Sequence, residues 1–179
     1  MTGRGSGSQD GGPAFSKSRR DAMISTARKA AKDLAIQAQD LDFGILKFGK
    51  SFDELAWVQS FNGGAKGRDK SATARLALVI GVGQFNTMIQ QGTVLGGIVD
   101  INLLKTQAPT HYKALEKAGI LKPSERTALT MINRIRNSMA HVYSNTTPEE
   151  TYTAIKNFHY LLNSDLPQRL DAWLKDLGI

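Results

Sequence analysis

The chain has 179 residues, a formal net charge of +7 and no cysteine. This length predicts one domain with a sizeable core, and the missing cysteine excludes disulfides, zinc thiolates and thiol catalysis. The basic balance favours a polyanionic partner, although many basic proteins bind no nucleic acid. No apolar run approaches the roughly 18 residues of a membrane span, and residues 1–12 lack the apolar block of a signal peptide, so we expect a cytoplasmic protein.

The first part of the chain predicts a tail followed by a long helix. Residues 1–14 are rich in glycine, serine and charge, which is typical of a disordered tail. We expect residues 15–179 to form a single helical domain. A helix is predicted from about Ser16 to Asp40, because apolar residues recur there at helical spacing: Met23, Ala27, Ala30, Leu34 and Ala38. Its basic residues are interpreted as a solvated face.

The middle of the chain predicts a short helix, a loop and a buried helix. Ser51 and Glu54 fit a capping box at the start of a helix over 51–61. Residues 62–70 contain three glycines and predict a flexible basic loop, which lacks the ending of a phosphate-binding P-loop. Residues 71–91 are apolar nearly all round and predict a central helix covered on most sides. Gly81 and Gly83 within it are interpreted as points of close helix approach.

The last third of the chain predicts four helical segments after a loop or short helix over 92–101. A short helix over 110–117 ends at Gly119, and Pro123 opens a longer helix that runs to about Tyr143. Its expected apolar stripe is Ala128, Met131, Ile132, Ile135, Met139 and Val142. Thr147 and Pro148 begin the next helix, and a last helix spans 167–177. The sum is an all-α bundle with an antiparallel helix pair at its C-terminal end.

The side chains best suited to phosphate binding and proton transfer lie near the end of the helix that begins at Pro123. Arg136, Asn137, His141 and Tyr143 lie within two turns. Arginine can hold a phosphate by two hydrogen bonds, histidine can exchange a proton near neutral pH, and the amide and phenol can position or donate. The bland alternative is a histidine and an arginine that bond the final carbonyls of their helix.

The helical period separates two of these residues. Asn137 and His141 are four positions apart and share a face, whereas Arg136 and His141 are five apart, about 140° around the axis. A second copy of the segment across a two-fold axis would bring one arginine–histidine pair opposite another, which predicts a homodimer. No group of His, Asp and Glu has metal-ligand spacing, so neither metal nor cofactor is expected. His159 is interpreted as a satisfied core or interface histidine, and neither it nor His111 is needed.

One segment of the chain resembles the signature of the HEPN superfamily, and in particular the Arg-x4-His-x-Tyr form of HepT-like toxins. It consists of Arg136, four further residues, His141, Val142 and Tyr143. In that family a polar residue follows the arginine, and Asn137 stands there. The resemblance is residue-level over about 132–143 and architectural over about 71–162. Val142 departs from the glycine of many HepT sequences, and the N-terminal segment and the 62–70 loop exceed the minimal toxin.

The resemblance implies a HEPN-like helical bundle that acts as a dimeric, metal-independent endoribonuclease in a toxin–antitoxin or antiphage defence system. Arg136, His141 and Asn137 would be catalytic. Arg134, and Lys66 and Arg68 of the basic loop, are the candidates for contact with RNA. Tyr143 would be the site that a partner antitoxin, such as a nucleotidyltransferase, modifies. Two alternatives stay open. One is a non-catalytic HEPN-fold regulatory or binding module, because the mannitol-operon repressor family carries a similar segment. The other is a helical structural protein in which the motif is incidental.

Overall fold

A computed structural model describes residues 15–46, 65–140 and 146–179. Within these residues every regular element is a helix and none is a strand, which confirms the predicted all-α class. The predicted tail (1–14), the predicted short helix (51–61) and the end of the motif (141–145) lie outside the described residues. The helices are α2 (Lys17–Leu46), α4 (Ala65–Leu95), the 3-10 helix η1 (Ile101–Leu103), α5 (Ala108–Lys117), α6 (Pro123–Met139), α7 (Pro148–Leu162) and α8 (Leu166–Asp176).

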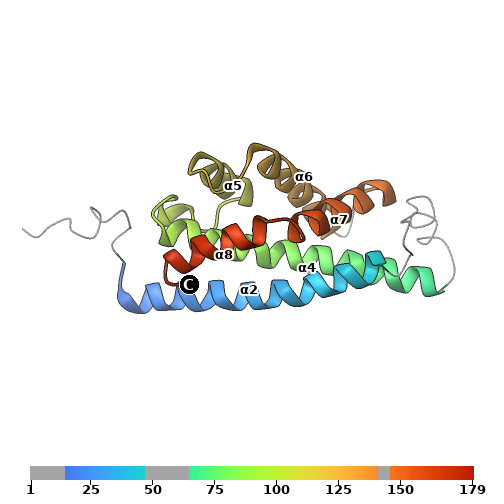
Figure 1. Cartoon of the computed structure of the whole chain (residues 1–179), viewed down its shortest axis with the longest axis horizontal. Helices are drawn as coiled ribbons and strands as arrows, with labels where there is room; N and C mark the ends of the chain where they lie inside the picture. Colours follow the sequence, from blue (N-terminus) through green and yellow to red (C-terminus); the bar gives the residue numbers. More distant parts are fainter. Residues whose placement is uncertain (1–14, 47–64, 141–145) are drawn as a thin grey trace, which may run out of the picture.

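The two longest helices, α2 and α4, run antiparallel along each other (Figure 1). Helices α7 and α8 run back along this pair, while α5 and α6 lie against α4 on the side away from α2. Helices α6 and α7 form the antiparallel pair that the sequence predicts. Helix α4 therefore lies at the centre, in contact with α2, α5, α6 and α7. None of the described helices is long and apolar enough to cross a membrane.

The core is built around Phe85 of α4. Its ring meets Phe158 of α7 edge-on at 6.2 Å and Tyr112 of α5 at 6.4 Å between ring centroids. All three side chains are buried, and each comes from a different helix. Burial of such large rings is a major source of stability. Of the predicted apolar face of α2, Met23, Ala27, Ala30 and Leu34 are buried, and Ala38 is half-buried.

Two parts of the predicted core are wrong in detail. Met131 was expected on the apolar stripe of α6, but 42% of it is exposed, and Leu129 is buried beside Ile132 instead. A buried stripe centred on Leu129, Ile132 and Ile135 follows the helical period and leaves Met131 on the far side. Leu76, in the helix expected to be covered on most sides, is 60% exposed.

The predicted loop over 62–70 is also wrong for 65–70, which form the first turns of α4. Alanine, lysine and arginine are good helix formers, and they outweigh a single glycine at Gly67 once the helix continues into a packed segment. At the other end, residues 92–95 continue α4, and the 3-10 helix η1 follows after a turn. Thr147 caps α7 as predicted, because its hydroxyl accepts a hydrogen bond from the backbone N–H of Glu150 at 3.2 Å.

Candidate functional site

Helix α6 carries the motif residues that the structure describes. Pro123 is its first residue, and the Glu125 carboxylate accepts a hydrogen bond from the Lys122 backbone N–H at 2.8 Å. The helix ends at Met139 with Ala140 as its C-terminal cap. His141 and Tyr143, the expected acid–base and regulatory residues, lie outside the described residues.

The Arg136 side chain reaches from α6 to the backbone of α4. Its Nε donates to the Val79 carbonyl oxygen at 3.0 Å, and its Nη1 donates to the Asn137 side-chain oxygen at 3.0 Å. Gly83 provides the space, because a Cβ there would lie 2.7 Å from Nη2 of Arg136. The close approach expected at Gly83 is therefore that of an arginine side chain. At Gly81 it is between helices, since a Cβ would lie 3.2 Å from Phe158.

A polar groove of about 510 Å³ lies between α4, α6 and the start of α5. One wall is a stripe of α6 whose members are three or four residues apart: Thr130, Asn133, Arg134 and Asn137, with Arg136 beside them. The opposite wall is Gly83, Asn86, Thr87 and Gln90 of α4, and Thr106, Gln107, Ala108 and Pro109 close one end. The lining is rich in amides and hydroxyls, and among the described residues its charged members are Arg134 and Arg136.

The floor of the groove holds a chain of hydrogen bonds between three helices. The Tyr112 hydroxyl of α5 donates to the side-chain oxygen of Asn86, and the Asn86 side-chain nitrogen donates to the side-chain oxygen of Asn133 at 2.8 Å. Both amides are more than nine-tenths buried, and Tyr112 is fully buried. Burial raises the pKa of the Tyr112 phenol, although the Arg136 charge and the Asn86 hydrogen bond act against this. Tyr112 therefore remains a protonated donor.

Sequence reasoning missed this chain of hydrogen bonds. Asn86 lies within a segment that the sequence predicts to be an apolar helix, and Asn133 lies next to the predicted apolar stripe. One signal was available: a buried polar side chain needs a partner, so an asparagine within an apolar helix predicts a second polar group facing it. The sequence could not say which one, because the three residues are 21 or more positions apart.

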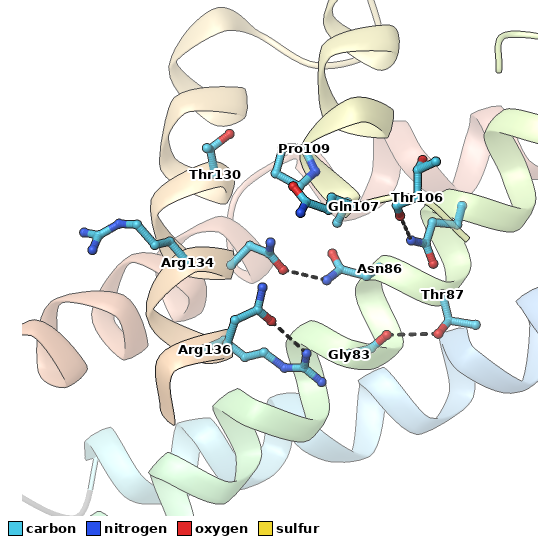
Figure 2. A pocket seen from close by; sticks show the side chains of 13 residues that line it. Gly83, Asn86, Thr87, Thr106, Gln107, Pro109, Thr130, Arg134 and Arg136 are labelled. Atoms are coloured by element: carbon cyan, nitrogen blue, oxygen red, sulfur yellow. Dashed lines mark hydrogen bonds between the residues drawn. The ribbon is translucent and has the colours of Figure 1, made fainter. Parts of the chain in front are cut away.

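The two motif-associated arginines differ in how they lie. Arg136 is half-buried against α4, whereas Arg134 is exposed and extends away from Asn86 and Arg136 (Figure 2). Within the described residues, no carboxylate forms an ion pair with either arginine. Lys66 and Arg68, the other expected RNA contacts, lie in the first turns of α4, and their side chains are outside the described part of the structure.

The two described histidines have structural partners. His111 is fully buried, with Nδ1 2.6 Å from the Thr93 hydroxyl and Nε2 3.1 Å from the Leu103 carbonyl oxygen. Burial lowers its pKa, so the neutral form is favoured. His159 Nε2 lies 2.6 Å from the Asp42 carboxylate and joins α7 to α2, which agrees with the expected satisfied histidine.

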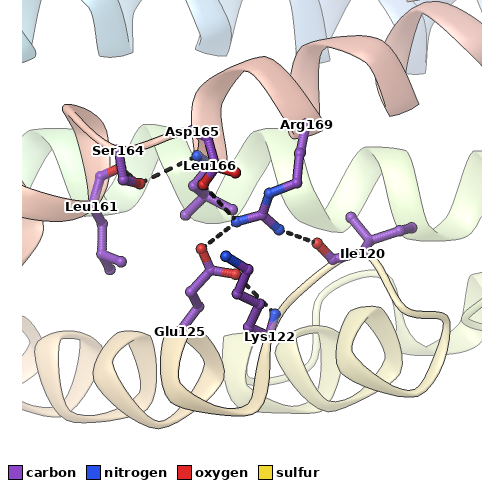
Figure 3. Close-up of polar contacts among 8 residues, drawn as sticks. All are labelled: Ile120, Lys122, Glu125, Leu161, Ser164, Asp165, Leu166 and Arg169. Carbon is purple, nitrogen blue, oxygen red and sulfur yellow. Dashed lines mark hydrogen bonds and ion pairs between the residues drawn. The ribbon is translucent and has the colours of Figure 1, made fainter.

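A second polar cluster, centred on Arg169 of α8, connects helices (Figure 3) and shares no residue with the groove lining. Its Nη1 donates to the Ile120 carbonyl oxygen at 2.7 Å, and its Nη2 donates to the carboxylates of Glu125 and Asp165. The Glu125 hydrogen bond is the main reason that the pKa of Arg169 is raised, and the hydrogen bond from Arg169 lowers the pKa of Asp165. Because Glu125 also caps α6, this arginine holds the start of α6 against α8.

Comparison with protein-family models, curated proteins and solved structures gives no match for this chain. The resemblance to the HEPN superfamily therefore stays a prediction from the sequence segment that ends at Tyr143.

Gly83→Ala tests whether Arg136 needs the space at Gly83. The new Cβ would force the guanidinium to move, whereas replacing a helical glycine by alanine stabilises a helix by roughly 1 kcal/mol. We expect an unfolding temperature at or above that of the wild type, and a shift of the Arg136 Nε–H resonance as its hydrogen bond to Val79 breaks. Gly81→Ala is the control: it should leave that resonance in place and lower stability. An unchanged Nε–H signal in Gly83→Ala would contradict the assignment.

Arg169→Met tests the cluster at the start of α6. The substitution leaves the buried Glu125 carboxylate without its cation, so we expect the free energy of unfolding to fall by about 3 kcal/mol in urea denaturation. Lys175→Met removes an exposed ion pair with Asp171 (N–O distance 3.0 Å). This substitution should change the free energy of unfolding by less than about 1 kcal/mol. Equal losses in the two variants would show that Arg169 does not anchor the helix.

Proposed function

We propose that this protein is a metal-independent endoribonuclease of the HEPN type, acting on RNA through Arg136 and His141. The observation that carries the proposal is the setting of Arg136. It lines an open groove of amides and hydroxyls, with no ion-paired carboxylate among the described residues. A cation held in this way attracts an anionic group from outside the chain.

The chemistry uses the residue types at the end of α6. In the proposed reaction one histidine takes the proton of a ribose 2′-OH while the 2′-oxygen forms a bond to phosphorus. The bond from phosphorus to the 5′-oxygen breaks, and a second histidine gives that oxygen a proton. Arg136 stabilises the extra negative charge on the phosphoryl oxygens, and Asn137 fixes Arg136 through its hydrogen bond to Nη1. The products carry a 2′,3′-cyclic phosphate and a 5′-hydroxyl.

The proposal includes a homodimer, because two histidines and a better-aligned arginine–histidine pair require a second copy of the motif. One described feature of α6 supports this: Met131, five residues before Arg136, is 42% exposed and lies on the face that also carries the exposed Arg134. A toxin–antitoxin or antiphage defence system is the setting that the HEPN resemblance implies. The expected modification of Tyr143 stays a prediction.

A second function, a non-catalytic nucleic-acid or protein-binding module, is favoured by a different observation. Two of the three nitrogens of Arg136 already donate within the chain, to Val79 and to Asn137. Such an arginine can serve to join α6 to α4 and to bind an anion without any chemistry. RNA cleavage distinguishes the two functions.

The ribonuclease proposal is tested by incubating single-stranded RNA with the protein in excess EDTA. We expect cleavage that leaves 2′,3′-cyclic phosphate ends, and a loss of roughly a hundredfold or more in turnover for His141→Ala and for Arg136→Ala. His159→Ala removes a histidine that pairs with Asp42 away from the groove, so it serves as the control and should retain activity. Activity that survives both motif substitutions would place the chemistry elsewhere, and its absence in the wild type would favour the binding module.

The dimer is tested by placing a charge on the exposed face of α6. Met131→Asp should give a folded monomer in sedimentation velocity at micromolar concentration, with loss of RNA cleavage, because an unpaired charge is costly to bury in an interface. Leu76→Asp is the matched control, since Leu76 is also exposed and apolar but lies on α4. A wild-type monomer that cleaves RNA would contradict the homodimer.

A further inference from the structure

The polar groove contains a donor that the motif does not include. Asn133 is 6% exposed, and its side-chain oxygen is occupied by the Asn86 amide. Its side-chain nitrogen has no acceptor among the described residues, yet it is not cut off from solvent, and Asn133 lines the groove. A buried asparagine with its oxygen satisfied and its nitrogen open to a groove is arranged to donate hydrogen bonds to a ligand.

The orientation of the Asn133 amide is set through Asn86 by the Tyr112 hydroxyl. Tyr112 donates to the Asn86 oxygen, so the Asn86 nitrogen must face Asn133. The Asn133 oxygen then faces Asn86, and its nitrogen is left for the groove. Each link is buried, so reversing one amide alone would bring two donors or two acceptors together. Reversing both amides would leave the hydrogen of the buried Tyr112 hydroxyl without its acceptor. The Tyr112 hydroxyl thus determines which atom of Asn133 a ligand meets.

We propose that Asn133 is a further binding residue of the groove, whose side-chain N–H groups donate to a phosphate oxygen beside Arg136. Asn133 and Arg136 are three positions apart on α6 and line the same groove. Every group that we assign to this phosphate is a donor, and one of them is a cation, which suits an anionic oxygen better than a neutral carbonyl. The proposal rests on the proposed function in taking RNA as the source of the phosphate. Tyr112 and Asn86 are positioning residues for this site.

Two substitutions test the direction of the amide. Asn133→Asp keeps the oxygen that accepts from Asn86 but turns the groove-facing nitrogen into a charged oxygen. Asn86→Asp leaves Asn133 intact but takes away its donor, so the Asn133 amide should rotate and present its oxygen to the groove. Asn86 itself lines the groove, and Asn86→Asp adds a negative charge there, so the direction of the Asn133 amide is read from its own side-chain resonances.

The probe is a short single-stranded 2′-O-methyl RNA, which has the phosphates of RNA and no free 2′-OH to react. We expect both substitutions to weaken its binding by roughly tenfold or more, and inorganic phosphate to compete with it. The control is Asn163→Asp, which adds the same charge at an exposed asparagine that bonds the backbone of α7. In the wild type, the Asn133 side-chain amide resonances should shift as the probe is added, a measurement that needs no variant to fold.

The outcomes separate this proposal from the ribonuclease proposal. If both substitutions bind like Asn163→Asp, or if the wild-type amide resonances do not move, Asn133 is not a binding residue even where the wild type cleaves RNA. Failure of the wild type to bind the probe, or of phosphate to compete, also overturns the proposal. If binding falls as expected but the wild type cleaves no RNA in EDTA, the phosphate site stands and the ribonuclease proposal fails.

Discussion

The burial of α4 is the constraint on which the rest of the structure depends. Its apolar side chains point in nearly every direction, so a single partner helix cannot cover them. Helix α2 covers one side, and α7, α5 and α6 cover others. The central position of Phe85, which meets rings from both α5 and α7, follows from this arrangement. Helices from the two ends of the chain are thus brought around one helix.

The same constraint determines where polar groups of α4 can lie. A buried amide that lacks a partner costs roughly 1–3 kcal/mol, so Asn86 must meet other polar groups where α5 and α6 approach. It meets Tyr112 and Asn133, and the groove opens at that point. Arg136 meets α4 close by, at a backbone carbonyl beside a glycine. The polar groove is therefore one place where the covering of α4 is incomplete.

Periodicity predicted the helices well because it reports which face of a segment is apolar, as at Met23, Ala27 and Ala30. It was less informative at the ends of elements. Residues 65–70 look like a loop from Gly67, the glycines just before them and their charges, and they become helical because a long packed helix follows. Periodicity was also less informative for α6, where Leu129 and Met131 lie on either side of the centre of the predicted apolar stripe, and the sequence did not show that Leu129 is the buried one. The all-α class could be predicted from the apolar pattern alone, whereas the groove could not, because it forms only where three helices pack together.

The candidate site shows the same division. The motif identified Arg136 from the sequence, but not how the protein holds it. The expected use of arginine was a fork with two free donors. In the structure the single hydrogen of Nε is given to Val79, so the side of the guanidinium that joins Nε to Nη2 cannot grip a phosphate. Only the end formed by Nη1 and Nη2 remains, and Nη1 already gives one of its two hydrogens to Asn137.

This orientation has a consequence for how the groove would handle a phosphate. An arginine whose position is set by α4 has lost its side-chain freedom before a ligand arrives, so binding needs less ordering. The same holds for Asn133, whose amide is fixed by Asn86. A site of two pre-oriented donors is suited to stabilising charge that develops at one oxygen, but it supplies no proton. In the proposed reaction, the proton transfers are assigned to His141 and to its counterpart in a dimer. The groove and the histidines therefore contribute different parts of the proposed reaction, and an amide substitution should weaken binding while a histidine substitution should slow turnover.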